Sequence, residues 1–459
     1  MSDLNAHLLP GLTHWQAPSF AAWYPAHTTY PGLLGELLSG AINAIGFSWA
    51  SCPAGTELES IVLDWLADAL ALPAAFRTHH DGEEGGGARG PGGGVIQCTA
   101  SDAVLVALLA AKARALGGWV AAAPGGGGGG AGDAAAALAA TRLVAYTSDQ
   151  AHSCVRKACM VAGIAHLREL PTREEDGWSL RAPALEAALA ADAAAGLTPC
   201  FVVATIGTTA TCAVDDVAGI GACLATSFPE EEGGGGGGGA PGRPWLHVDG
   251  AYAGTAAVCP EHRPQPAWAG LSSADSFSTN AHKALLTPFD CAPLWVADAT
   301  HLRSALSLTP SFLRGTANDL DFRDWQVPLG RRLRSLKLWM VLRTYGRSGL
   351  QAFVRHAAGL AERFEAHVAS DARFEVAAPR RLGLVCFRLA GGDPGASKAT
   401  AALVEALNAG GKAMMVTAEV GGRTLARAAW GGAGTQARHV DGAWAAVVAA
   451  LEGMGGGSV

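Results

Sequence analysis

The sequence predicts an α/β protein: a large domain with a mostly parallel sheet flanked by helices, followed by a smaller C-terminal α+β domain. Two observations support this fold class. Short apolar runs alternate with amphipathic helical stretches over most of the chain, and long helical stretches dominate after Phe322. We therefore expect an N-terminal segment over 1–29, a large domain over 30–336 and a small domain over 337–459.

In the large domain, the predicted helices and strands alternate along the chain. Residues 101–116 and 182–195 have the spacing of amphipathic helices. Short apolar runs typical of strands lie at Arg142–Tyr146, Cys200–Thr205, Trp245–Val248 and Pro293–Val296. Because the strands of a parallel sheet are covered on both faces, such continuous apolar runs favour a parallel arrangement.

Three glycine-rich segments interrupt this pattern, at 85–94, 124–132 and 230–242. Ordering polyglycine costs a large backbone entropy, so we expect mobile surface loops there. Gly92 to Gly94 run directly into Val95, and a structured turn is the alternative at that point. None of the three segments follows a strand and opens a helix with GxGxxG spacing, so a dinucleotide site is not supported.

The last third of the chain is mainly helical. Arg331–Tyr345 and Leu350–Ala369 have helical patterns, a strand-like run follows at Leu382–Leu389, and a final helix is expected near Val440–Leu451. This mixture of helices with a strand predicts the small α+β domain.

Composition excludes several function classes. Charged residues make up 16% of the 459 residues, and the formal net charge of −7 leaves no basic stripe for nucleic acid or an anionic membrane. The ten cysteines form no CxxC pair, and the chain start lacks the pattern of a secretory leader. We expect a reduced, cytoplasmic protein without a transmembrane segment, acting on a small molecule.

Asp249 and Lys283 carry the chemistry that the sequence predicts. Asp249 ends the strand-like run WLHVD, and ligands bind at the carboxyl ends of parallel strands. Lys283 follows the turn Asn280-Ala281-His282. A carboxylate that keeps a pyridine nitrogen protonated and an amine that bonds to an aldehyde are what pyridoxal 5'-phosphate requires, so we predict this cofactor. A metal site at His247 and Asp249 is disfavoured, because no third ligand stands at a recognisable spacing.

Several motifs stand in order along the chain. They are Pro10–Trp15 (PGLTHW), Gly46–Trp49 (GFSW), Thr56–Glu59 (TELE), Gly94–Gln97 (GVIQ), Ser148–His152 (SDQAH), Ala204–Thr209 (ATIGTT), His247–Gly254 (HVDGAYAG), Asn280–Lys283 (NAHK), Asp324–Gln326 (DWQ) and Leu338–Trp339. Together they resemble group II pyridoxal-phosphate decarboxylases of fold type I. Within that family the chain is similar to the aromatic L-amino acid decarboxylases, whose plant branch includes tyrosine and tryptophan decarboxylases and aromatic acetaldehyde synthases.

The resemblance implies roles for individual residues. Lys283 would bond to the cofactor, His152 would stack over its ring, Asp249 would bind the pyridine nitrogen, and Thr209 and Ala251 would contact the ring. The residues implied at the phosphate are Thr99, Ala100, Ser101, Asn280 and His282, with Leu329 and Gly330 near the phosphate and the substrate pocket. Without the resemblance, His152 would be an ordinary loop histidine and Thr99–Ser101 a helix N-cap, although a capped N-terminus also binds anions.

The resemblance also implies an aromatic substrate pocket, built partly by the second subunit of a homodimer. The matching positions are Trp15, Trp23, Tyr24, Pro25, Ile45 and Phe47, which by themselves would be taken for core residues. We expect decarboxylation of tyrosine, phenylalanine, tryptophan or dopa. A glycine at 330 leaves room for a bulky ring, and plant relatives with this glycine tend to accept indoles.

Phe312 is the most consequential departure from the family pattern. Amine-forming relatives carry tyrosine there, on a mobile loop, and its hydroxyl protonates the substrate carbon after carbon dioxide leaves; phenylalanine has no such proton. The same replacement marks aromatic acetaldehyde synthases, in which dioxygen reacts and aldehyde, ammonia and peroxide form. The loop from Phe312 to Trp325 is shorter than in the family, and Ala284 stands where the family usually has tryptophan.

Three functions therefore stand open at the level of sequence. They are an aromatic acetaldehyde synthase, an ordinary decarboxylase that yields the arylalkylamine, and a catalytically silent relative that still binds the cofactor. The chain begins near the end of the helices with which the family wraps its partner subunit. We accordingly expect residues 1–29 to be a truncated segment, arising from a truncated gene model or belonging to a smaller dimer.

Overall fold

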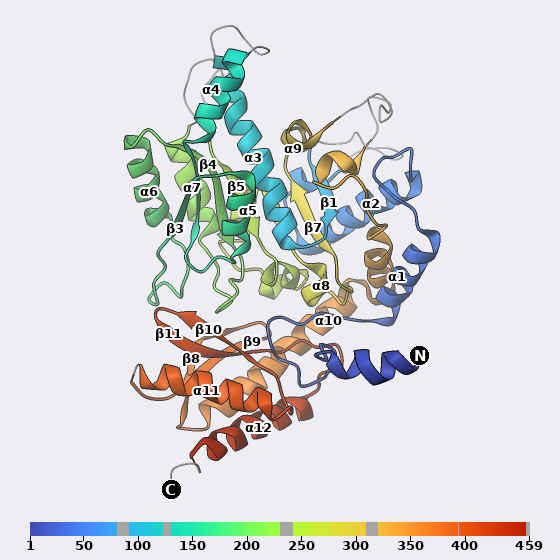
Figure 1. The fold of residues 1–459 in the computed structure, drawn as a ribbon, viewed down its shortest axis with the longest axis vertical. Coiled ribbons are helices and arrows are strands. Elements are labelled where there is room, and N and C mark those ends of the chain that lie inside the picture. Colours follow the sequence, from blue (N-terminus) through green and yellow to red (C-terminus); the bar gives the residue numbers. More distant parts are fainter. Residues whose placement is uncertain (80–90, 123–129, 230–241, 309–319, 393, 456–459) are drawn as a thin grey trace. The chain divides into compact units, whose positions relative to one another are not determined.

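The computed structural model describes residues 1–79, 91–122, 130–229, 242–308, 320–392 and 394–455 (Figure 1). It contains two compact units. One comprises Tyr30–Gln351, and the other combines Met1–Thr29 with Ala352–Val459. The domain boundary expected at 336/337 stays a prediction.

A seven-stranded sheet forms the centre of the larger unit. The strands are β1 (Gly93–Gln97), β2 (Leu143–Ser148), β3 (His166–Leu170), β4 (Thr198–Thr205), β5 (Trp245–Asp249), β6 (Ser276–Ser278) and β7 (Ala292–Val296), in the order β1-β7-β6-β5-β4-β2-β3. The pairs β2–β3, β2–β4, β4–β5 and β5–β6 are parallel, whereas β7 runs antiparallel to both of its neighbours. The predicted mostly parallel sheet is confirmed, with the four predicted strands close to their expected bounds.

The helices of the larger unit are α1 (Tyr30–Ile42), α2 (Pro53–Leu70), α3 (Ala100–Ala122), α4 (Gly130–Ala140), α5 (Cys154–Ala162), α6 (Ala182–Ala194), α7 (Val217–Ser227), α8 (Ala281–Ala284), α9 (Ala299–Leu306) and the start of α10 (Ser335–Ala369). Of these, α2, α3, α6, α7 and α8 contact strands of the sheet. α3 lies across the sheet and contacts β1, β4, β5, β6 and β7 (Figure 1). Its buried face joins Phe201, Val203 and Trp245 in one core cluster, so α3 covers the sheet face on which these strand residues lie.

The smaller unit contains a four-stranded antiparallel sheet in the order β10-β11-β9-β8. Its elements are β8 (Phe374–Arg381), β9 (Leu384–Leu389), α11 (Gly395–Ala409), β10 (Val416–Val420), β11 (Arg423–Ala429) and α12 (Ala437–Gly455). Phe364, Phe387 and Trp430 pack at the centre of its core. The predicted small α+β fold is confirmed, and together with the parallel sheet it matches fold type I.

Two local expectations at the glycine-rich segments were wrong. Gly93 and Gly94 form the start of β1 rather than a loop, and residues 130–132 lie in α4. The two helical stretches predicted at 331–345 and 350–369 correspond to two helices within α10, which begins at Ser335 rather than Arg331 and is kinked by non-helical backbone at Gly346 (φ +62°). The rest of the glycine-rich segments, 85–90, 124–129 and 230–241, lies outside the described residues.

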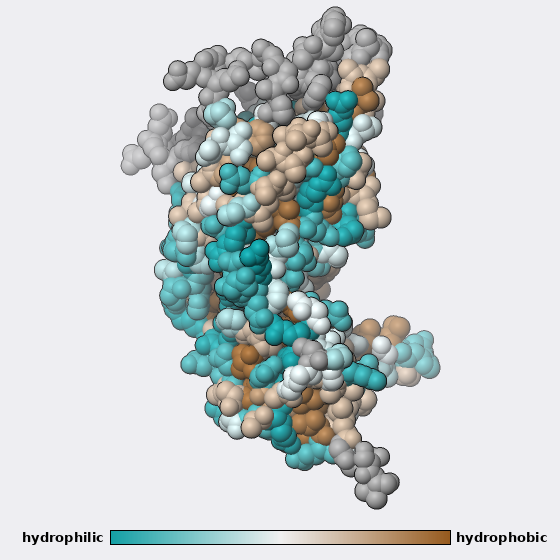
Figure 2. Space-filling view, turned by 90° about the vertical axis from the view of Figure 1, so that its left-hand side faces the viewer, coloured by the Kyte–Doolittle hydropathy of each residue, from teal (hydrophilic) through white to brown (hydrophobic). Residues whose placement is uncertain are grey.

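Hydrophilic and hydrophobic residues are mixed on the face that Figure 2 shows. In the part of the chain that the structure describes, no helix combines the length and the apolar character needed to cross a bilayer.

Candidate active site

Asp249 lies at the carboxyl end of β5, beside the ends of two neighbouring strands. It pairs in register with Thr205 of β4 and with Ser278 of β6. Side chains of in-register residues in a parallel sheet share one face, so the three point to the same side. Asp249 is buried, and its Oδ1 accepts a hydrogen bond from the N–H of Ala251 at 2.9 Å. The carboxylate is thus held in place by its own strand end.

His152 lies just before α5, and its electrostatic neighbours are Asp249 and Lys283. His152 is exposed to solvent. Even so, partial desolvation lowers the pKa of the imidazole; Asp249 opposes this shift and Lys283 adds to it. The N–H of Cys154 donates to Nδ1 of His152 at 3.1 Å, which fixes the ring orientation. The structure therefore groups the three residues predicted to hold the cofactor ring.

Main-chain hydrogen bonds fix the turn that carries Lys283. Gly250 N donates to Ser278 O at 2.8 Å, Asn280 N donates to Ala251 O at 3.1 Å, and Lys283 N donates to Asn280 O at 2.9 Å. The turn 278–283 is therefore tied to the residues that follow Asp249. His282 is buried, with its Nδ1 2.9 Å from Cys291 O, and burial lowers the pKa of its imidazole to about 4.

The residues predicted to bind the cofactor phosphate, Thr99 to Ser101, lie at the N-terminus of α3. Thr99 N and Oγ1 both donate to Asp102 Oδ2, at 3.0 and 2.9 Å, which caps the helix. Ser101 is exposed and hydrogen-bonds to the thiol of Cys154, the residue two positions after His152. The N-terminus of α3 therefore lies next to the turn that carries His152. The free backbone N–H groups in the first turn of a long helix attract a phosphate.

Several buried polar atoms lack a hydrogen-bond partner among the described residues, and three of them lie at or next to strand ends of the large sheet: Asn280 Oδ1, Ser148 Oγ and Thr205 Oγ1. Ser148 and Thr205 end the adjacent strands β2 and β4, and Asn280 precedes α8. A buried polar atom without a hydrogen-bond partner is costly. The position of these atoms at the carboxyl edge of the large sheet therefore suits a polar ligand that would bond to them. The residues present therefore fit pyridoxal phosphate: a carboxylate, an amine, a flat ring and a helix start.

Thr209, predicted to contact the ring, stands in the exposed tip of a loop that follows β4. The loop is closed by hydrogen bonds from Gly207 N and Thr208 N to Ala213 O, both 2.9 Å. At its base the carboxylate of Asp215 accepts N–H groups from Thr205 and Leu180, at 2.7 and 2.8 Å. Burial raises the pKa of Asp215 to about 7, although the two N–H donors oppose the shift.

A second group of predicted residues, Ile45, Phe47, Leu329 and Gly330, lies around the segment 323–334. Arg323 N donates to Phe47 O at 2.9 Å, and a Cβ on Gly330 would lie 3.8 Å from Ile45. The same segment reaches the residues predicted to bind the phosphate, because Arg334 Nη2 lies 2.9 Å from Cys98 Sγ, next to Thr99. Arg331 is buried against Glu59, which also accepts from Ile96 N at 2.8 Å.

The four remaining pocket candidates belong to the smaller unit. The rings of Trp15 and Trp23 stack with centroids 5.1 Å apart, Arg427 lies over Tyr24, and Pro25 packs against Gly431. The structure describes these contacts within that unit, and their part in the substrate pocket stays a prediction. Phe312 lies outside the described residues.

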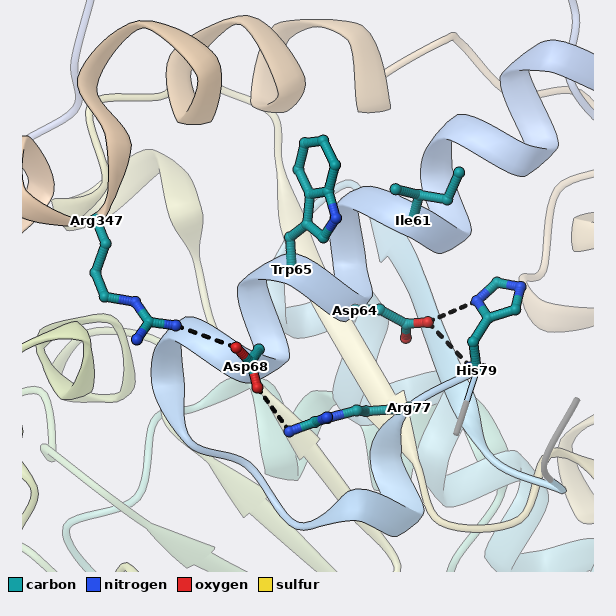
Figure 3. A pocket seen from close by; sticks show the side chains of 7 residues that line it. All are labelled: Ile61, Asp64, Trp65, Asp68, Arg77, His79 and Arg347. Atoms are coloured by element: carbon teal, nitrogen blue, oxygen red, sulfur yellow. Dashed lines mark hydrogen bonds and ion pairs between the residues drawn. The ribbon is translucent and has the colours of Figure 1, made fainter. Parts of the chain in front are cut away.

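A hollow beside the end of α2 contains none of the predicted cofactor residues (Figure 3). Asp64 accepts from His79 N at 3.0 Å and lies 2.8 Å from His79 Nδ1. Asp68 pairs with Arg77 at 2.7 Å and with Arg347 at 3.2 Å. Because each carboxylate is already paired with a cation or a hydrogen-bond donor, the polar residues around this hollow stabilise the local structure.

Comparison with known proteins identifies the class to which this site belongs. The pyridoxal-dependent decarboxylase conserved domain matches residues 1–390. The chain is 42% identical to phenylacetaldehyde synthase of Arabidopsis thaliana over 453 residues, which are 97% of this chain and 84% of that protein. It is 44% identical to the aromatic-L-amino-acid decarboxylase of Bos taurus over 449 residues, 97% of this chain and 84% of that protein.

Among solved structures, the crystal structure of Oryza sativa TDC with PLP and tryptamine is similar, with a TM-score of 0.87 and 38% identity over 99% of this chain and 87% of that one. The chain therefore belongs to the pyridoxal-phosphate-dependent decarboxylases. More narrowly, it is a carboxy-lyase of the branch that contains aromatic amino acid decarboxylases and phenylacetaldehyde synthase, with pyridoxal 5'-phosphate as cofactor.

Sequence reasoning missed Asp215, which ties the Thr209 loop to β4. It stands in the run Val214-Asp-Asp-Val217, where one aspartate caps α7 through Gly219 N at 3.0 Å and the other points inward. The pattern shows two acidic residues before a helix but not which of them is buried.

Proposed function

We propose that the protein decarboxylates an aromatic L-amino acid and releases the arylacetaldehyde instead of the amine. The observation that carries this proposal is Phe312, which has no hydroxyl to protonate the substrate carbon after carbon dioxide leaves. The overall reaction would convert amino acid, dioxygen and water into aldehyde, carbon dioxide, ammonia and hydrogen peroxide. The likeness to phenylacetaldehyde synthase supports the proposal.

The roles of the site residues follow from their chemistry. Pyridoxal phosphate, when bound, supplies a protonated ring that takes up the electron pair left by carbon dioxide. Lys283 would hold the cofactor covalently through its amine, and Asp249 would pair with the pyridine nitrogen. His152 and Ala251 would lie on opposite faces of the ring. Thr209 would contact the ring, and Asn280, His282, Thr99, Ala100 and Ser101 would bind the phosphate.

The pocket for the aromatic side chain would involve Ile45, Phe47, Leu329 and Gly330 together with Trp15, Trp23, Tyr24 and Pro25. Ile45 is exposed and lies next to Gly330. The absence of a side chain at Gly330 leaves space that suits the bulky ring of an aromatic substrate. We further propose that two copies form a homodimer and that it works in the cytoplasm, where ten free thiols stay reduced.

The second candidate is amine formation, which the likeness to the aromatic-L-amino-acid decarboxylase of Bos taurus favours. In that case a water or another side chain would supply the proton. The two candidates differ in whether oxygen is consumed.

The deciding experiment measures carbon dioxide, oxygen uptake, amine, aldehyde and peroxide together, with tyrosine, phenylalanine, tryptophan and dopa as substrates. Wild-type protein should consume oxygen in step with carbon dioxide release. Phe312→Tyr should shift the product towards amine, because general acid catalysis is worth about 10² to 10⁴ in rate. Amine formation by the wild type without oxygen uptake would exclude the aldehyde proposal, and no turnover with any substrate would favour a silent relative.

A further inference from the structure

A row of buried polar side chains runs along β5 and β6 towards Asp249. Trp245 Nε1 donates to Ser276 Oγ at 2.7 Å, Ser276 Oγ lies 2.8 Å from His247 Nδ1, and His247 Nε2 lies 3.2 Å from Ser278 Oγ. His247, Ser276 and Ser278 have no exposed surface. Ser278 is the in-register neighbour of Asp249 across the two strands.

The chemistry of the groups gives this row a direction. The indole of Trp245 can only donate, so Ser276 Oγ accepts from it. The proton of Ser276 then has the imidazole Nδ1 as its acceptor, and the imidazole proton lies on Nε2, facing Ser278. The opposite tautomer would leave the Ser276 proton without an acceptor in a fully buried place, which is unfavourable.

His247 is also neutral. Burial lowers the pKa of its imidazole to about 4, and the nearby Asp249 only partly opposes the shift. The ring is stacked on Phe201, with centroids 6.1 Å apart and planes at 15°. An uncharged, fixed imidazole therefore stands two residues before Asp249 on the same face of β5.

We propose that His247 is a positioning residue for Asp249. By donating its Nε2 proton to Ser278 Oγ, His247 directs the Ser278 hydroxyl proton towards the Asp249 carboxylate. The carboxylate that would bind the pyridine nitrogen then has a neutral hydrogen-bond donor beside it. This inference rests on the proposed role of Asp249 in cofactor binding. It assigns the Trp245–Ser276–His247–Ser278 row a function beyond packing the sheet.

The test measures the affinity of the apoprotein for pyridoxal phosphate, the absorbance bands of the bound cofactor and the melting temperature of the apoprotein. His247→Leu should weaken cofactor affinity about ten-fold, the effect of one hydrogen bond, and should change the ratio of the two absorbance bands. His247→Gln keeps an N–H donor and should restore most of the affinity. Ser278→Ala removes only the last hydroxyl and should act in the same direction as His247→Leu.

Tyr146→Phe provides the matched control. Its hydroxyl, on β2, is buried and donates to Asp192 Oδ2 of α6 at 2.9 Å, so its loss should lower the melting temperature and leave the cofactor bands unchanged. In an Asp249→Ala background, His247→Leu should cause no further loss of affinity. The proposal is overturned if His247→Leu and Ser278→Ala behave like the control. If wild-type apoprotein itself binds no cofactor, the proposed function fails instead, so the two failures are distinguishable.

Discussion

Lys283 carries the amine that stands beside Asp249 and His152 at the carboxyl edge of the sheet. If this amine holds the cofactor covalently, Lys283→Ala should abolish turnover, because alanine has no amine with which to form the bond. Borohydride should then fix no cofactor to the variant, as mass spectrometry would show. Lys157→Ala, at an exposed position of α5, should retain both properties. Turnover in the Lys283 variant would contradict the central assignment.

Asp249 is the second residue to which the proposed mechanism assigns a role. Asp249→Ala removes the charge proposed to keep the ring nitrogen protonated, so the rate of carbon dioxide release should fall by orders of magnitude even when cofactor is bound. The matched control is Asp298→Ala, which removes a half-buried cap of α9 whose Oδ1 accepts from Thr300 N at 2.8 Å. A rate within a few-fold of wild type would mean that another group holds the nitrogen.

At the scale of the elements, buried strands were predictable because their apolar runs are continuous. β4, β5 and β7 are buried along their length and were found within two residues of their ends. β3 was missed because its sequence, HLREL, is largely polar and only Leu170 is buried. β1 was misjudged because tertiary packing overrides the flexibility of glycine: a Cβ at Gly94 would lie 2.8 Å from Trp295.

Some residues of the candidate site were likewise predictable from the sequence, and others were not. Asp249, His152 and Lys283 lie in sequence motifs, so their grouping could be expected, whereas the loop base at Asp215 and the row through His247 depend on which strands become neighbours. Sequence order does not show that β6 pairs with both β5 and β7. That pairing brings Ser276 and Ser278 to His247.

The buried groups at this sheet edge predict how stability depends on pH. Burial lowers the pKa of His247 and of His282 from 6.5 to about 4, and it raises the pKa of Asp215 from 3.8 to about 7. Between pH 4 and 6.5, the unfolded chain therefore carries two histidine protons that the folded chain lacks, and the folded chain carries one proton on Asp215. The unfolded chain binds one proton more, so stability rises with pH.

The slope from these three groups should be about 1.4 kcal/mol per pH unit. Chemical denaturation of the apoprotein at a series of pH values between 4 and 6.5 measures it. His247→Gln removes one of the two histidine contributions, and its slope over this window should be close to zero. A wild-type stability that falls with rising pH would show that Asp215 or other groups dominate.

At the scale of the whole molecule, α1 gives the strongest indication of a second copy. Its buried face consists of small residues, Pro31, Gly32, Gly35 and Ser39, and a Cβ at Gly35 would lie 2.4 Å from the backbone of Lys337. The leucines therefore lie on the outside: Leu33, Leu34, Leu37, Leu38 and Ile42 are 43–60% exposed. A helix that buries its glycines and exposes its leucines needs an apolar partner.

A second copy is the partner that suits this face, since homodimers commonly use one apolar patch on both subunits. If the proposed homodimer forms through α1, Leu34→Glu with Leu37→Glu should convert it to monomer, as measured by sedimentation, because two charges cannot be buried unpaired in an apolar interface. Leu138→Glu, at a position of α4 that is 62% exposed, should leave the oligomeric state unchanged. If the double variant stays dimeric, the interface lies elsewhere. If it is monomeric and folded but still fully active, each subunit has a complete pocket of its own, and the expectation that the pocket is built partly by the second subunit is wrong.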